Sequence, residues 1–78
     1  MEQDVLMASI FVSNLLGQDN FTELLINMPD DYFKLTGYAQ ISLWKMIYYQ
    51  VSRGNCEIEF LTNLASEWLK LYKDMYPV

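Results

Sequence analysis

Residues 36–55 decide the fold of this chain, and they read TGYAQISLWKMIYYQVSRGN. Within them, apolar residues recur at the three- and four-residue spacing that places side chains on one face of an α-helix. That face consists of Ile41, Trp44, Tyr48 and Val51, with Leu43, Met46 and Ile47 beside it. Because little of the circumference is left for solvated residues, we predict a helix over residues 38–53 that lies at the centre of the domain.

The residues that flank this helix are of helix-capping types. The Thr36 side chain can accept a hydrogen bond from an amide of the first turn. Gly54 fits the left-handed conformation that follows many helices, and Asn55 predicts the cap of a last helix. That helix should run to about Tyr76, where Pro77 stops it. Its apolar face consists of Ile58, Leu61, Leu64, Ala65, Trp68, Tyr72 and Met75.

Two helices and a short helical turn are predicted before the central helix. The first helix covers residues 3–16 and ends at Gly17. Its broad apolar face consists of Val5, Ala8, Val12 and Leu15, with Leu6, Ile10 and Leu16 beside it. The second helix begins with Asn20 as its cap and must stop near Pro29. A short helical turn follows over residues 30–35.

These elements define the expected fold class. No run of alternating apolar and polar residues predicts a strand, and no segment resembles a linker between domains. We therefore predict an all-α fold with a single domain over residues 1–78. It should be a compact bundle of four helices with a short extra helical turn between the second and the third.

The apolar N-terminal segment, residues 5–16, has to be compared with membrane and export segments. It is shorter than the ~20 residues that span a bilayer. It also follows the carboxylates of Glu2 and Asp4, where a signal peptide carries positive charge. We therefore expect a chain that makes no membrane contact and stays in the reducing cytoplasm, which a single cysteine, Cys56, permits.

The size and composition of the chain point to a partner. A domain this small buries only about 60–65% of its unfolded surface, so its core alone should supply roughly 3–5 kcal/mol. The usual disulfide or metal reinforcement is not expected, because the chain has one cysteine and no histidine. Its apolar fraction is 53%, above the ~45–50% of ordinary globular chains. We infer that some apolar surface meets another polypeptide.

Charge is distributed unevenly along the chain. The first 33 residues carry six carboxylates and no basic residue, and the whole chain has a formal charge of −5. The candidate partner-binding acidic residues are Glu2, Asp4, Asp19, Glu23, Asp30 and Asp31. An alternative explanation is helix electrostatics, because most of these carboxylates fall near predicted helix N-termini, where the helix dipole stabilises them.

An acidic chain with five dispersed cations is a poor ligand for nucleic acid, because phosphate contacts need clustered Lys and Arg. We expect instead a small acidic regulator or inhibitor that docks on a larger protein with a basic surface, for example the groove of a nucleic-acid-binding protein. Small phage-encoded inhibitors often work in this way, so a phage or other mobile-element source is included in the hypothesis. Because clustered basic residues are missing, a helix-turn-helix regulator built on residues 36–53 is disfavoured.

The aromatic and apolar residues give a second route to an interface. Tyr48 and Tyr49 point about 100° apart on a helix, so they cannot both face one core. We expect Trp44, Trp68, Tyr48 and Tyr72 in the core. The candidate apolar interface residues are Met46, Tyr49, Leu71, Met75 and Tyr76, since Tyr, Trp and Met are enriched in interfaces. A rival hypothesis is that the apolar surface left outside the core binds other copies of the chain, in a helical homodimer or a higher oligomer.

Catalysis is not expected. Histidine is absent from the chain, and no serine lies in a nucleophile-elbow motif. The acidic pairs Asp30–Asp31 and Glu57/Glu59 lie in no calcium-loop pattern. The carboxylates near Cys56 disfavour a reactive thiolate, so we expect a buried or incidental thiol. We therefore predict no catalytic residue, no metal ligand and no cofactor.

Overall fold

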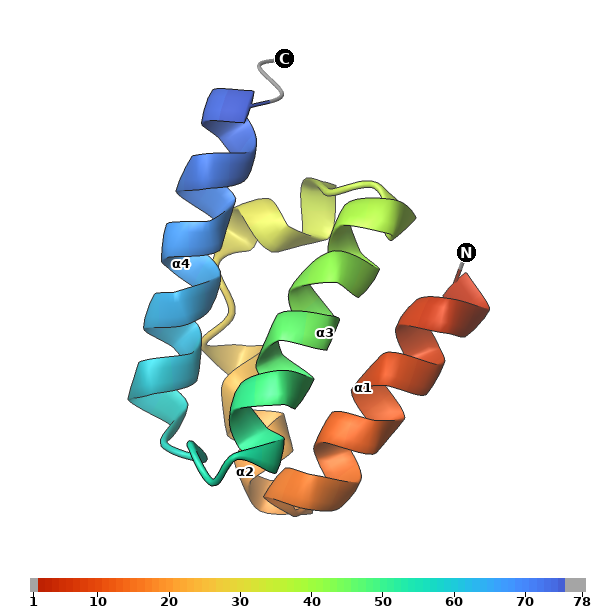
Figure 1. Ribbon diagram of the computed structural model, residues 1–78, viewed down its shortest axis with the longest axis vertical. Coiled ribbons are helices and arrows are strands. Elements are labelled where there is room, and N and C mark those ends of the chain that lie inside the picture. Colours follow the sequence, from red (N-terminus) through yellow and green to blue (C-terminus); the bar gives the residue numbers. More distant parts are fainter. Residues whose placement is uncertain (1, 76–78) are drawn as a thin grey trace.

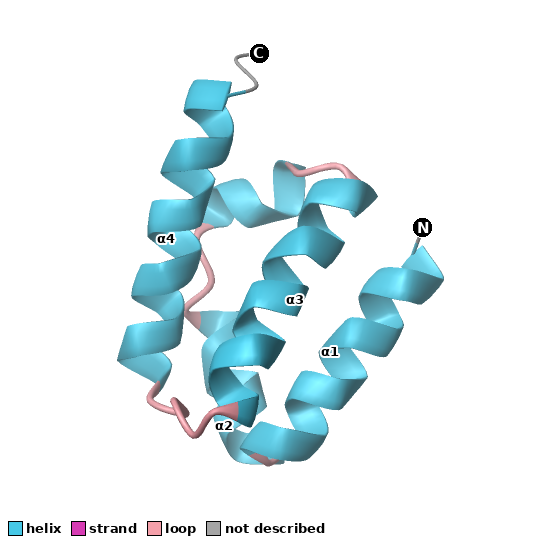
Figure 2. Ribbon diagram, in the orientation of Figure 1, coloured by secondary structure: helices cyan, strands magenta, loops and turns pink. Residues whose placement is uncertain are grey.

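The structure, a computed structural model, describes residues 2–75, apart from the side chain of Glu2, and forms them into helices and short loops (Figures 1 and 2). The elements are α1 (Glu2–Leu16), α2 (Gln18–Ile26), the 3₁₀ helix η1 (Asp30–Lys34), α3 (Gly37–Ser52) and α4 (Ile58–Met75). The predicted all-α bundle of four helices, with a short helical turn between the second and third, is thus confirmed.

Helix α3 occupies the middle of the molecule, with α1 on one side and α4 on the other (Figure 1). Helix α1 packs on α3 and α2, and α4 packs on the same two helices. The shared core is made of apolar side chains with at most 6% exposure: Val12, Leu16, Leu24, Met28, Tyr32, Ala39, Leu43, Trp44, Ile47, Val51, Leu61, Ala65 and Leu69. Burial of these side chains drives folding, and the predicted central position of α3 follows from it.

The ends of α3 form as their residues predict. The Thr36 side chain accepts a hydrogen bond from the Ala39 amide at 3.3 Å. At the other end, Gly54 has a φ of +96°. Its amide donates to the Val51 carbonyl, and the Asn55 amide donates to the Gln50 carbonyl, both at 3.0 Å. This bond pair satisfies two carbonyls that the helix end would leave free.

Two predicted caps are wrong. Asn20 lies inside α2, where its side-chain amide donates to the Leu16 carbonyl at 3.1 Å, and the helix begins after Gly17 without a side-chain cap. Asn55 does not cap α4, because its side chain donates to Gln50 Oε1 at 2.7 Å. The helix starts three residues later, at Ile58. The predicted helix end at Tyr76 and the stop at Pro77 lie outside the described residues.

The predicted orientation of some large side chains is also wrong. In α1, Leu6, Ile10 and Leu15 are exposed, although all three were expected on the buried face. Of the four aromatic residues expected in the core, Trp44 is fully buried, Trp68 and Tyr72 are half-buried, and Tyr48 is exposed. Tyr48 lies at the edge of the α1–α3 contact, where no other helix covers it.

Candidate protein-binding surfaces

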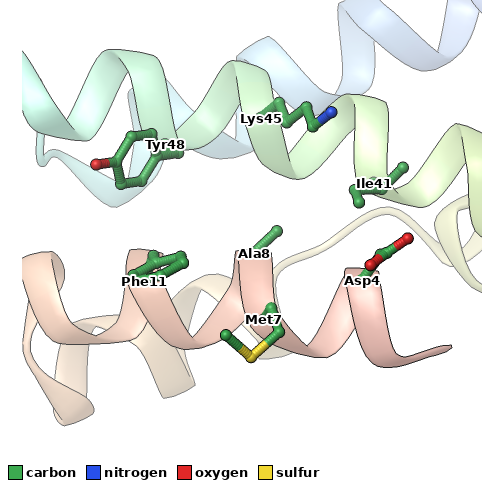
Figure 3. A pocket seen from close by; sticks show the side chains of 7 residues that line it. All are labelled: Asp4, Met7, Ala8, Phe11, Ile41, Lys45 and Tyr48. Atoms are coloured by element: carbon green, nitrogen blue, oxygen red, sulfur yellow. The ribbon is translucent and has the colours of Figure 1, made fainter. Parts of the chain in front are cut away.

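A groove runs between α1 and α3 (Figure 3) and has a volume of about 510 Å³. Asp4 and Ile41 lie at one end of it, and Phe11 and Tyr48 at the other. The Phe11 and Tyr48 rings meet edge to face, with centroids 6.2 Å apart. Lys45 supplies a cationic rim on the α3 side, and Asp4 an anionic rim on the α1 side. The groove is therefore mainly apolar, with one charge of each sign.

The outer side of α1 continues this apolar surface. Five large side chains on α1 are between 42% and 58% exposed: Leu6, Met7, Ile10, Phe11 and Leu15. Val12 and Leu16, on the opposite side of the same helix, are in the core. Helix α1 is thus apolar around most of its circumference, which is typical of a helix that is covered on all sides.

A second groove lies between α3 and α4 and has a volume of about 330 Å³. Its wall on α4 includes Trp68 and Tyr72, whose stacked rings have centroids 5.2 Å apart. Leu71 and Met75 also line it and are 62% and 69% exposed. Tyr38, at the start of α3, completes the groove and is 83% exposed. Large apolar side chains thus remain accessible on both walls.

Of the four predicted apolar interface residues that the structure describes, it brings Leu71 and Met75 together in this second groove. Tyr49 lies elsewhere on α3, where Arg53 donates a hydrogen bond to its hydroxyl and stacks its guanidinium 5.1 Å from the ring centroid. Met46 is half-buried, and Tyr76 lies outside the described residues. Sequence reasoning missed Tyr38, because a single tyrosine in a first helical turn carries no periodic signal.

The predicted acidic residues are dispersed over the fold. Asp4 is in the α1–α3 groove, whereas Glu23 lines a small hollow between α2 and α4 together with Glu59. Asp19 and Asp30 are exposed on α2 and η1. The remaining two are Asp31, which is paired with cations, and Glu2, whose side chain lies outside the described residues.

Asp31 has two cationic neighbours. Lys73 of α4 donates a hydrogen bond to its carboxylate, and Lys34 Nζ lies 3.8 Å from Asp31 Oδ1. The hydrogen bond and the charge of Lys73, with a smaller contribution from Lys34, hold the pKa of Asp31 below its usual value. The first 33 residues contain no cation, but the fold brings Lys34 and Lys73 next to Asp31. These two lysines reduce the negative potential around η1.

The remaining chemical features are possible metal ligands, the cysteine and possible membrane spans. Among residues 3–75, no three His, Cys, Asp or Glu side chains converge as a metal site would require. The Cys56 thiol is free and exposed. None of the helices in the part of the chain described by the structure has both the length and the apolarity to cross a bilayer. Comparisons with family models, with characterised proteins and with solved structures found no match for the chain.

Proposed function

We propose that this chain is a small acidic, non-enzymatic protein-binding domain. In this proposal it is a regulator or inhibitor that docks on a larger cytoplasmic protein with a basic surface, in the manner of small phage-encoded inhibitors. The observation that carries the proposal is the uncovered apolar groove between α3 and α4, with Leu71 and Met75 on its rim. Burying this groove against a partner would release water from large apolar side chains, which drives protein association.

The lining of the groove has the composition of a binding hot spot. Tyr, Trp and Met are enriched at protein interfaces, where a few buried aromatic anchors supply most of the affinity. Trp68 and Tyr72 already stack on each other, so little side-chain freedom is lost when a partner covers them. Tyr38 adds a large ring to the opposite wall.

The charge of the chain supports a basic partner. A formal charge of −5 on 78 residues attracts a basic protein at long range and raises the rate of encounter. Lys73, which follows the groove residue Tyr72 on α4, is paired with Asp31. The apolar groove would therefore supply most of the affinity, and the net negative charge of the chain would supply the rate and the choice of partner.

The experiment compares the protein captured from a host lysate by the wild type and by two variants. Leu71→Ser removes an apolar side chain from the groove, and Ile26→Ser removes one from α2, where Ile26 is 76% exposed and outside both grooves. We expect a specific partner to be lost with Leu71→Ser and retained with Ile26→Ser. We also expect the amount captured to fall between low salt and ~0.5 M salt, where charges are screened beyond a few ångströms.

Two results would contradict this proposal. Equal capture by both variants would remove the α3–α4 groove from the binding surface. Capture that does not change with salt would leave an apolar interface but exclude the electrostatic role of the acidic residues.

A further inference from the structure

The outer side of α1 is a second exposed apolar surface, separate from the α3–α4 groove. This helix is at the edge of the molecule (Figure 1), where it packs on α3 and α2. No charged residue occurs in the sequence from Val5 to Gln18, although much of this segment is exposed. Solvated helices normally carry charges of both signs on their outer side. An uncharged, half-apolar outer side therefore indicates a face that is covered when the protein functions.

A regular seam runs along this face. It consists of Gln3, Met7, Ile10 and Asn14, all exposed, at the four- and three-residue spacing by which two helices interlock. These positions lie on the side of α1 opposite the buried Val12 and Leu16. Leu6 lies along one side of the seam and Phe11 along the other. The middle of the seam and both of its long sides are therefore apolar.

The seam has the same order of residue types in both directions along the helix. Uncharged amides occupy its two ends, and apolar side chains occupy its two central positions. A second α1 helix that runs antiparallel would place Met7 against Ile10 in both directions and Gln3 against Asn14. The amide side chains both donate and accept hydrogen bonds, so each end of the seam can satisfy the other. The face is thus complementary to itself.

We propose that the outer face of α1 binds a second copy of this chain, in a two-fold symmetric dimer with antiparallel α1 helices. Antiparallel packing places Asp4 of each copy near the uncharged end of the other copy's helix. Parallel packing would instead bring the two Asp4 carboxylates and the two positive helix ends together, which is unfavourable. The charge distribution therefore selects the antiparallel arrangement.

The area of the face agrees with a weak, reversible dimer. The five half-exposed large side chains on α1 supply the apolar part of the contact area in each copy. With the flanking polar side chains, a dimer would bury about 1,000–1,200 Å² in total, at the lower end of specific interfaces. We therefore expect dissociation in the micromolar range.

The uncharged character of the face argues for self-association over a foreign basic protein. A basic partner needs carboxylates to meet its cations, and the segment between Asp4 and Asp19 has none. This dimer is independent of the α3–α4 groove, because that groove is lined by residues of α3 and α4 alone. Both surfaces can therefore be occupied at once, and each can be tested without the other.

The test is analytical ultracentrifugation of the pure chain from about 1 to 300 µM, the range that brackets a micromolar dissociation constant. The wild type should shift from 9.2 kDa toward twice this mass. Met7→Glu and Ile10→Lys should each raise the dissociation constant at least tenfold, because each inserts a charge into an apolar contact. Ile26→Lys, on an exposed position outside the face, should dimerise as the wild type does. Circular dichroism checks that every variant remains folded.

Mixing the two single variants tests the direction of the helices. In the antiparallel dimer, Glu at position 7 of one copy meets Lys at position 10 of the other, so the mixture should form a heterodimer that neither variant forms alone. If both variants stay monomeric and the mixture does too, the antiparallel arrangement is wrong. A wild type that remains at 9.2 kDa throughout overturns the dimer. Neither result bears on capture through Leu71.

Discussion

The hydrogen bond between Tyr32 and Trp44 is the main polar contact in the core. Trp44 Nε1 donates to the Tyr32 hydroxyl at 2.6 Å, and the two residues are 1% and 5% exposed. The hydroxyl in turn lies 3.5 Å from Gln40 Oε1, so it connects η1 to α3. Burial raises the pKa of Tyr32, and the hydrogen bond from Trp44 partly offsets this rise. The hydroxyl therefore stays protonated through the neutral range.

Tyr32→Phe should destabilise the fold by about 1–3 kcal/mol, because it leaves the buried Trp44 N–H without an acceptor. The free energy of unfolding in urea measures this loss. Tyr38→Phe is the matched control, since Tyr38 is 83% exposed. Removal of its hydroxyl leaves no buried group without a hydrogen-bond partner. That variant should remain within about 0.5 kcal/mol of the wild type. Equal stability of the two variants would mean that the hydrogen bond contributes nothing.

Residue-level contacts of this kind could not be predicted from the sequence. Trp44 was expected in the core from its helical spacing, but nothing in the order of residues indicates that Tyr32 accepts its hydrogen bond. The same holds for Asp31 and Lys73, which are 42 positions apart. Periodicity reports the face on which a side chain lies, whereas its partner depends on how helices pack. The charge pattern of the first 33 residues was therefore an incomplete guide to the surface potential.

At the scale of elements, Gly17 determines how α1 connects to α2. Its φ of +86° and ψ of 151° lie in a region that only glycine adopts without strain. The Gly17 amide donates to the Ser13 carbonyl at 2.9 Å, and the Gly17 carbonyl accepts from the Phe21 amide at 3.0 Å. One residue thus ends one helix and starts the next, so α2 can pack against both α1 and α4.

Gly17→Ala should lower the free energy of unfolding by about 1–3 kcal/mol through backbone strain. The added methyl group would meet no atom within 4 Å, so steric overlap does not contribute. Gln18→Ala, at the exposed first residue of α2, should change stability by less than about 0.5 kcal/mol. Urea denaturation of the three proteins gives both values. A Gly17→Ala variant as stable as the wild type would show that the turn adopts another conformation.

Helices were easier to predict than their orientation. Spacing and terminator residues identified all four, and Thr36 and Gly54 gave correct ends, because capping depends on local chemistry. Asn20 and Asn55 were misassigned because their side chains form other hydrogen bonds: Asn20 donates to the Leu16 carbonyl, and Asn55 donates to Gln50 Oε1. The exposed side of α1 could not be assigned, since a helix that is apolar all round has no sequence signal for its inner side. Its position at the edge of the bundle decides which residues remain uncovered.

At the scale of the whole molecule, the two uncovered apolar surfaces lie on opposite sides of α3. The α1 face is uncharged over its length, whereas the α3–α4 groove lies beside the charged pair of Asp31 and Lys73. A symmetric dimer through α1 would leave two α3–α4 grooves uncovered, because no residue of α1 lines them. Such a dimer could bind a repetitive or dimeric partner at two points, which increases the overall affinity through effective concentration.

Dimerisation also predicts how the stability of the whole molecule depends on concentration. Association stabilises the folded state by mass action, so the Tm of the wild type should rise by roughly 3–5 °C for each tenfold increase in concentration above the dissociation constant. Ile10→Lys should show a lower Tm at high concentration and no such rise, because its folded monomer has no partner. Ile26→Lys should follow the wild type. Differential scanning calorimetry between about 20 and 500 µM measures the slope. A Tm independent of concentration in the wild type would mean that the core alone holds the fold, and that the apolar side of α1 contributes nothing to stability.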